Sequence, residues 1–129
     1  MSRFTIALAV IALALAACGG GGGDTELTVS MEDIRFDPAE WSVSAGEEIS
    51  LTAINAGFLD HEFVIVEAGS EISTTDEFSD GDAYWETGAI SGQTTSEFTF
   101  TAPEAGEYQV ICTIDNHFDA GMAGTLTVR

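Results

Sequence analysis

From residue 25 onward, apolar and polar residues alternate along several short runs of the chain. A period of two is typical of β-strands that bury one face. The alternating runs cover 27–31, 41–44, 49–53, 98–101, 108–112 and 125–128. A continuous apolar run at 63–66 is typical of a strand covered on both faces. Turn-forming residues separate the runs and no convincing amphipathic helix interrupts them. The pattern therefore predicts one all-β domain over 25–129, an antiparallel β-sandwich or barrel.

One stretch, 68–89, does not alternate and is rich in Ser, Thr, Gly and acidic residues. We expect one long acidic connection there, with room for a turn of helix. Long connections of this kind are often functional or mobile. The acidic side chains in and beside it are Glu67, Glu71, Asp76, Glu77, Asp80, Asp82 and Glu86, with Tyr84 and Trp85 near its end. Two interpretations stay open: a docking patch for a partner, or a solvated face in a chain that is acidic throughout.

The N-terminal segment has the pattern of a signal peptide. Arg3 precedes an uncharged, mostly apolar run at 4–17, which is shorter than the roughly 20 residues needed to span a bilayer. The run ends in Leu-Ala-Ala followed by Cys18, which resembles the lipobox of bacterial lipoproteins. We therefore expect a lipoprotein signal peptide at 1–17, then a lipidated Cys18 and a Gly-rich tether at 18–24. The alternative is ordinary cleavage before Cys18, with that cysteine incidental.

Charge and composition narrow the possible functions. The chain has 22 acidic and 3 basic residues among 129, a formal net charge of -19. Such a charge repels phosphate backbones, so we expect no binding to nucleic acid. Hydrophobic residues make up 45% of the chain, which is enough to form a core and argues against a disordered acidic tail. Two histidines leave little material for acid–base catalysis, so an enzyme is not expected.

The candidate chemistry lies near the C-terminus. Cys112, His117 and Met122 follow one another with the spacing C-x4-H-x4-M, between two predicted strands. His61 precedes the predicted strand 63–66, where a neighbouring strand end could bring it beside this segment. Two imidazoles, a thiolate and a weak axial thioether are the ligands of a blue copper site. Zinc would need a firmer ligand than a thioether, and a binuclear copper site would need a second Cys in the loop.

Each of these residues also has an ordinary structural interpretation. A histidine at a strand end is usually at the surface, a buried cysteine packs as a small hydrophobe, and methionine fills gaps in the core. Taken together, however, the four residues include both histidines of the chain and, once Cys18 is lipidated, its single free thiol. The joint pattern favours a mononuclear copper site.

The segments around these residues resemble the cupredoxins of the plastocyanin/azurin family, over roughly residues 27–129. The run 107–112 is similar to the strand that leads into the Cys ligand, with Tyr108 placed like the tyrosine of a tyrosine corner, and 55–61 is similar to the segment that carries the first His. The resemblance implies a Greek-key β-sandwich with His61, Cys112, His117 and Met122 as ligands of one copper ion. The loop spacing is closer to rusticyanin- and auracyanin-like members, and the lipobox and acidity resemble halocyanins.

The chain departs from the family pattern in two places. Glu62 stands where many members have Asn after the first His, and Asp115 and Asn116 stand where many have Pro-Gly before the second His. Contacts just outside the ligands tune a metal site. Carboxylates near copper favour Cu(II), so we expect a lower reduction potential than is usual in the family.

The resulting hypothesis is a lipid-anchored type 1 copper protein, exported to the periplasmic or extracellular face, that shuttles single electrons as a monomer. His117 would be the electron port, with Phe118 and Ala120 as apolar surface around it. The partner would be a cytochrome, reductase or oxidase with a basic docking patch. Two alternatives stay open: a protein that binds and delivers copper, and a metal-free β-sandwich interaction module.

Overall fold

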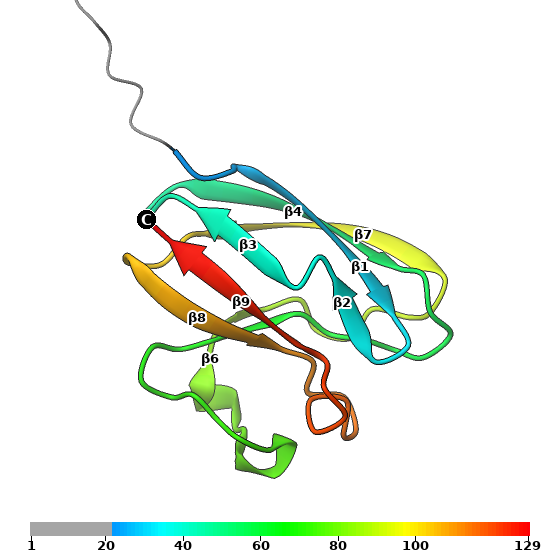
Figure 1. Cartoon of the computed structure of the whole chain (residues 1–129). Coiled ribbons are helices and arrows are strands. Elements are labelled where there is room, and N and C mark those ends of the chain that lie inside the picture. The colour runs from blue at the N-terminus through cyan, green and yellow to red at the C-terminus, as the bar shows by residue number, and fades with distance from the viewer. Residues whose placement is uncertain (1–21) are drawn as a thin grey trace, which may run out of the picture.

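The structure, a computed structural model, describes residues 22–129 (Figure 1). The predicted signal peptide 1–17, the predicted lipidation site Cys18 and residues 19–21 of the predicted tether lie outside the described residues. The described chain forms nine strands: β1 (Glu26–Glu32), β2 (Arg35–Asp37), β3 (Glu40–Val43), β4 (Glu48–Asn55), β5 (Val64–Val66), β6 (Ala83–Glu86), β7 (Thr94–Thr101), β8 (Gly106–Ile111) and β9 (Ala123–Val128). Two short 3-10 helices, η1 (Thr75–Glu77) and η2 (Asp80–Asp82), lie between β5 and β6.

The strands form two sheets that lie over one another as two layers (Figure 1). One sheet has the order β2-β1-β4-β7 and the other β3-β9-β8-β5-β6, which confirms the predicted β-sandwich. The sheets are mixed rather than purely antiparallel, because β1 pairs with β4 and β3 with β9 in parallel. Side chains alternate with the same period in both kinds of pairing, so the sequence pattern does not distinguish them.

An aromatic cluster fills the space between the sheets. The ring of Phe63 lies 5.1 Å from that of Trp41 and 5.7 Å from that of Phe36, both edge to face. All three residues are buried, and Phe63 is completely so. Edge-to-face pairs of this kind add to the stabilisation that comes from burying apolar area. Phe63 lies two positions after His61, so the core fixes the chain close to the candidate site.

The long connection covers the outer face of the five-stranded sheet. Val64 and Val66, together with Ile111 of β8, form a second apolar cluster on that face. Ile72 and Phe78 of the connection pack against it. The run 63–66 is therefore covered on both faces, as predicted. The pattern missed β6 within the connection, because its residues are only partly buried and do not alternate.

The strands run between two ends of the sandwich. At the end where β9 finishes, the hydroxyl of Tyr108 donates a hydrogen bond to the carbonyl of Glu104 at 2.8 Å. A bond from the tyrosine hydroxyl to backbone a few residues upstream is typical of a tyrosine corner. β8 leads from there to the opposite end, here called the loop end, over six residues or about 20 Å. Over the part of the chain that the structure describes, no helix is both long and apolar enough to cross a membrane.

Candidate metal centre

Two connections meet at the loop end of the sandwich. The connection after β4 carries His61, and the connection from β8 to β9 carries Cys112 and His117. β5 and β8 pair with Val64 opposite Ile111, which brings the residues just before β5 beside those just after β8. This strand pairing brings together two side chains that are 51 positions apart in the sequence.

The side chains of His61, Cys112 and His117 converge on one point. Sγ of Cys112 lies 4.0 Å from Nδ1 of His61 and 3.5 Å from Nδ1 of His117. The three ligand atoms lie within 4.8 Å of one another, and all three residues are buried. A soft sulfur suits Cu(I) and imidazole nitrogens suit Cu(II), and a trigonal set of this kind is the core of a blue copper site. The donor set therefore fits a copper ion.

Met122 occupies the last position of the same loop. Its side chain is fully buried, in the core cluster that also contains Cys112. Two hydrogen bonds fix its backbone: the N–H of Cys112 donates to the Met122 carbonyl at 3.2 Å, and the N–H of Met122 donates to the His117 carbonyl at 2.9 Å. Met122 thus lies beside the two loop ligands, and its role as axial ligand stays a prediction.

The sulfur of Cys112 is shielded and has a backbone donor. The N–H of Glu62 donates to Sγ at 3.3 Å. The Glu62 carboxylate accepts a hydrogen bond from the hydroxyl of Thr113, which fastens the connection carrying His61 to the one carrying Cys112. Burial raises the pKa of the Cys112 thiol, so copper binding must displace a proton from the sulfur.

His61 is held by backbone hydrogen bonds in both directions. Its backbone N–H donates to the Ile90 carbonyl at 3.1 Å, and its carbonyl accepts from the N–H of Ile90 at 2.8 Å. The buried amide of Asn55 donates to the carbonyls of Leu59 and Ile90, both at 2.8 Å. Burial, and secondarily the His117 ring, lowers the pKa of His61. The neutral ring keeps a lone pair free for a metal.

Asp33, in the turn between β1 and β2, is a further neighbour of His61. Its Oδ1 lies 3.6 Å from Nε2 of His61 and accepts the backbone N–H groups of Phe58 at 3.0 Å and Leu59 at 3.3 Å. The bond from Leu59, ahead of that from Phe58, lowers the pKa of Asp33, so this carboxyl is ionised at neutral pH. No sequence signal marks Asp33, because it is one of 22 acidic residues.

His117 is the cluster member nearest the surface. It is 6% exposed, whereas His61 is 0% exposed. The loop around it turns tightly: its N–H donates to the Ile114 carbonyl at 3.1 Å, and Asp115 and Gly121 have φ values of 49° and 105°. Glycine adopts a positive φ without steric cost, so position 121 suits the loop. Of the three side chains in the cluster, that of His117 is the most exposed to solvent.

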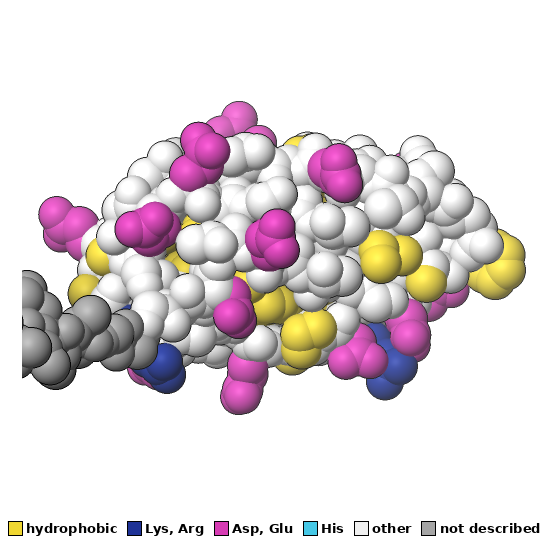
Figure 2. Space-filling view, turned by 90° about the horizontal axis from the view of Figure 1, so that it is seen from above, with side chains coloured by type: hydrophobic (Ala, Val, Ile, Leu, Met, Phe, Trp, Pro, Cys, Tyr) yellow, Lys and Arg dark blue, Asp and Glu magenta, His cyan; other side chains and the backbone are white. Residues whose placement is uncertain are grey.

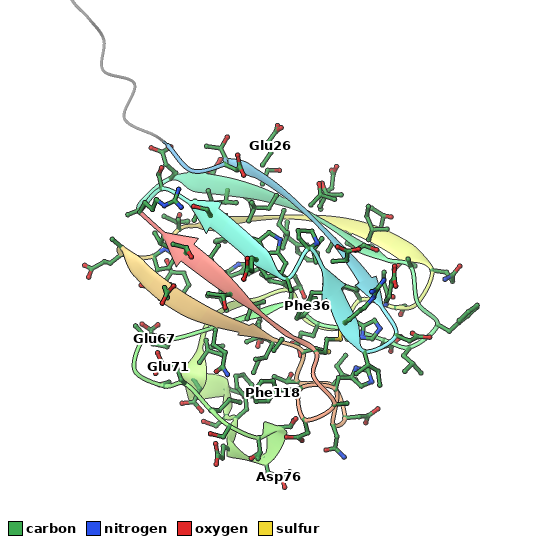
Figure 3. All side chains as sticks on the ribbon, viewed as in Figure 1. Glu26, Phe36, Glu67, Glu71, Asp76 and Phe118 are labelled. Atoms are coloured by element: carbon green, nitrogen blue, oxygen red, sulfur yellow. The ribbon has the colours of Figure 1, made fainter. Side chains whose placement is uncertain are left out.

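The acidic segment, residues 67–86, contacts this loop. The N–H of Thr75 donates to the carboxylate of Asp119 at 3.0 Å. Phe118 packs on the same apolar cluster as Phe78, and Figure 3 shows Phe118 beside the segment that carries Glu67, Glu71 and Asp76. Tyr84 is engaged elsewhere, because its hydroxyl donates to the Thr101 carbonyl at 2.9 Å. The part of the segment around η1 therefore contacts the loop that carries Cys112 and His117.

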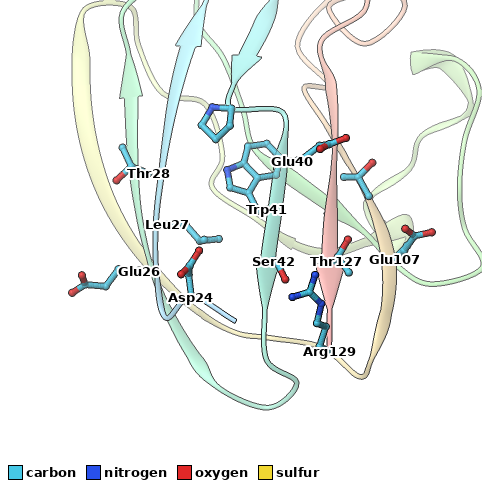
Figure 4. Close-up of a pocket in the computed structure, with 12 residues that line it drawn as sticks. Asp24, Glu26, Leu27, Thr28, Glu40, Trp41, Ser42, Glu107, Thr127 and Arg129 are labelled. Atoms are coloured by element: carbon cyan, nitrogen blue, oxygen red, sulfur yellow. The ribbon is translucent and has the colours of Figure 1, made fainter. Parts of the chain in front are cut away.

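A groove of about 690 Å³ lies away from the cluster (Figure 4). Residues of β1, β3, β8 and β9 line it, among them Glu26, Trp41, Glu107, Thr127 and the C-terminal Arg129. No histidine or cysteine lines it, and the group of candidate metal ligands found among the described residues lies at the loop end.

Comparison with known proteins agrees with the geometry of the cluster. The model of the copper-binding proteins of the plastocyanin/azurin family matches residues 23–129. The chain belongs to this family. It is thus a cupredoxin and a copper protein, and the resemblance found in the sequence is confirmed.

Two relatives and one solved structure resemble this cupredoxin closely. The copper-resistant cuproprotein CopI of Rubrivivax gelatinosus is 33% identical over 113 residues, which cover 81% of this chain and 66% of CopI. Auracyanin-A of Chloroflexus aurantiacus is 31% identical over 113 residues, which cover 76% of this chain and 69% of the relative. Reduced auracyanin of Roseiflexus castenholzii superposes with a TM-score of 0.71 at 25% identity, covering 84% of this chain and 99% of that one. The chain therefore spans about two thirds of the length of CopI.

The structure brings together three of the four residues that the sequence analysis predicted as copper ligands: His61, Cys112 and His117. Their assignment as copper ligands stays a prediction. The groups that hold them, above all Asp33 and the side chain of Asn55, were not recognised from the sequence. A short polar residue at a strand end, as at Asn55, is the one signal that marks such a support, because it readily bonds to nearby backbone groups.

Proposed function

We propose that this cupredoxin is an extracytoplasmic blue copper protein that shuttles single electrons between redox partners and is not itself an enzyme. The buried cluster of His61, Cys112 and His117, with only the His117 edge near the surface, carries the proposal. Copper bound there supplies one-electron chemistry between Cu(I) and Cu(II). The two imidazoles and the thiolate would form a trigonal ligand set, with Met122 as the weak axial ligand.

The chain holds its ligands in place by contacts that do not depend on the metal. The backbone bonds of His61 with Ile90, the bond from Glu62 to the sulfur, and the turn at His117 each fix one ligand. A site organised by its surroundings undergoes little rearrangement when its charge changes. This rigidity favours fast electron transfer.

A second candidate is a protein that binds and delivers copper. The name of CopI, a copper-resistant cuproprotein, favours it. The Roseiflexus auracyanin, by contrast, was crystallised in a dithionite-reduced form, which supports redox use of the related site. All three candidate ligands are buried here, which opposes rapid exchange of the metal with other chelators. We therefore favour the electron carrier.

The surface charge indicates the kind of partner. Figure 2 shows acidic side chains scattered over one face of the molecule, with few basic side chains. Within residues 22–129 the basic side chains are Arg35 and Arg129. Such a field raises the encounter rate with a basic surface by about 10 to 1,000-fold at low salt. We propose that the partner is a cytochrome, reductase or oxidase with a basic docking patch. This patch would meet the acidic segment beside the loop that carries Cys112 and His117.

The experiment that tests this function follows electron transfer from the reduced copper protein to a basic cytochrome over a salt series. The rate is expected to fall with salt, because ions screen the attraction. The triple variant Glu71→Gln, Asp76→Asn, Asp80→Asn should show a shallower fall. Asp82 is left intact, because it caps η2 by accepting the N–H of Ser79 at 2.9 Å.

A control variant removes three exposed charges from the groove side of the sandwich: Glu26→Gln, Glu40→Gln, Glu107→Gln. It should keep a steeper salt dependence than the first variant. Equal slopes in both would show that the acidic segment is only a solvated face. Loss of copper to a chelator during the measurement, without electron transfer, would favour copper delivery, and failure to bind copper stoichiometrically would favour a metal-free module.

We also propose that the protein is a membrane-anchored lipoprotein, on the strength of the lipobox at 15–18. Two acyl chains give stable attachment, whereas one gives only marginal binding. The wild-type protein should therefore enter the detergent-rich phase in a phase separation, and Cys18→Ser should remain unprocessed or enter the aqueous phase. Mature wild-type protein in the aqueous phase would contradict the anchor.

A further inference from the structure

One polar atom of the metal centre has no hydrogen-bond partner within the described residues. It is Nε2 of His61, in a side chain that is 0% exposed. Its nearest charged neighbour is the carboxylate of Asp33, with Oδ1 at 3.6 Å, just beyond hydrogen-bond length. Burying an imidazole nitrogen without a partner is costly, so the nearby carboxylate is its natural acceptor.

The Asp33 carboxylate is held in this position by the connection that carries His61. Its Oδ1 accepts two backbone N–H groups, from Phe58 at 3.0 Å and from Leu59 at 3.3 Å. The chain also leaves room for it at Gly57, where an added Cβ would collide with Oδ1. The carboxylate therefore occupies a space that only a glycine at position 57 leaves open. These contacts distinguish Asp33 from the other acidic residues on the surface.

The chemistry of imidazole connects this contact to the metal. A metal bound through Nδ1 takes the lone pair of that nitrogen and leaves the ring proton on Nε2. In the structure Nδ1 of His61 faces Cys112, and Nε2 faces Asp33. A carboxylate that accepts the proton of a metal-bound histidine orients the ring and makes its other nitrogen a stronger donor.

We propose that Asp33 is a positioning residue of the copper site, which accepts the Nε2 proton of His61 and shifts the site toward Cu(II). The more strongly donating imidazole and the nearby negative charge both stabilise the more positive ion, so Asp33 lowers the reduction potential. The inference rests on the proposed function, in which His61 is a ligand. The sequence analysis expected a lowered potential from carboxylates near the copper, at Glu62 and Asp115, and this inference adds Asp33 as a further carboxylate that lowers it.

Redox titration of the copper-loaded Asp33→Asn variant tests the proposal. The asparagine side chain keeps an oxygen that can accept the bonds from Phe58 and Leu59, so the change removes the charge and spares the loop. Loss of such a contact typically weakens metal binding about 10 to 100-fold. A tenfold loss for Cu(II) relative to Cu(I) corresponds to a rise of about 59 mV in the potential. The blue absorption band should remain.

The matched control is Asp60→Asn, which removes the same charge one position before His61 from an exposed side chain. Its effect should be smaller and should vanish at about 1 M salt, where the screening length is about 3 Å. Most of the effect of Asp33→Asn should persist there. A second variant, Gly57→Ala, should also raise the potential, because its Cβ displaces the Asp33 carboxylate.

The two failures are distinguishable. A wild-type protein that binds copper without a blue band overturns the proposed site itself. A blue wild-type protein in which Asp33→Asn leaves the potential unchanged, lowers it, or shifts it no more than Asp60→Asn does at high salt overturns the role of Asp33 alone.

Discussion

The replacement Cys112→Ser is expected to abolish the blue colour of the copper-loaded protein. An intense visible band and a narrow copper hyperfine splitting arise from covalent bonding between thiolate sulfur and Cu(II), and the harder oxygen of serine does not provide it. Sγ of Cys112 lies at the meeting point of both imidazoles, and the cluster of described residues contains no second thiol to take its place. Absorption and electron paramagnetic resonance spectra of the loaded variant measure the loss.

Met122→Leu serves as the comparison for this prediction. It removes the thioether that we propose as the weak axial ligand and keeps the buried volume. The blue band should therefore remain while the reduction potential rises, because an axial thioether helps to stabilise Cu(II). A blue Cys112→Ser protein would refute the assigned ligand set. An unchanged or lower potential in Met122→Leu would show that Met122 is not axial.

Phe63→Ala is expected to cost about 3–5 kcal/mol of unfolding free energy, the range for a fully buried aromatic side chain cut back to alanine. Phe63 is 0% exposed and contacts both Trp41 and Phe36 edge to face, so the change leaves a cavity between the two sheets. Such a loss is a large fraction of the stability of a small domain. Urea unfolding of the metal-free protein, followed by tryptophan fluorescence, gives the value.

Phe58→Ala is the matched control. The same side chain is removed, but Phe58 is 83% exposed, so the unfolding free energy should change by no more than about 0.5 kcal/mol. Equal losses in the two variants would contradict the burial pattern. The comparison also distinguishes a loss of stability caused by a cavity in the core from one caused by a change in the loop that precedes His61.

Several features of the fold were predictable because they depend on local pattern. A half-buried strand must alternate, so β4 and β8 could be recognised from their own residues. β2 escaped recognition because its three residues are too few to show a period, and β6 escaped it because its residues are only partly buried and do not alternate. The parallel pairing of β1 with β4 escaped it as well, because pairing direction depends on residues far away in the sequence.

The sequence by itself determined the chemistry of the site. It provides two histidines, one cysteine within residues 25–129, and a loop in which Cys112, His117 and Met122 are too close together to separate far in space. Local spacing limits where such side chains can lie, so this part of the site follows from the chain alone.

Only the tertiary structure decided how His61 joins that loop. The register that sets Val64 opposite Ile111 joins segments about 50 positions apart, and it depends on burial across the whole sheet. The same holds for Asp33, which reaches His61 from another turn and looks in the sequence like any other acidic residue. Long-range packing decides which of many similar carboxylates lies against His61, and no local pattern in the sequence indicates which one it is.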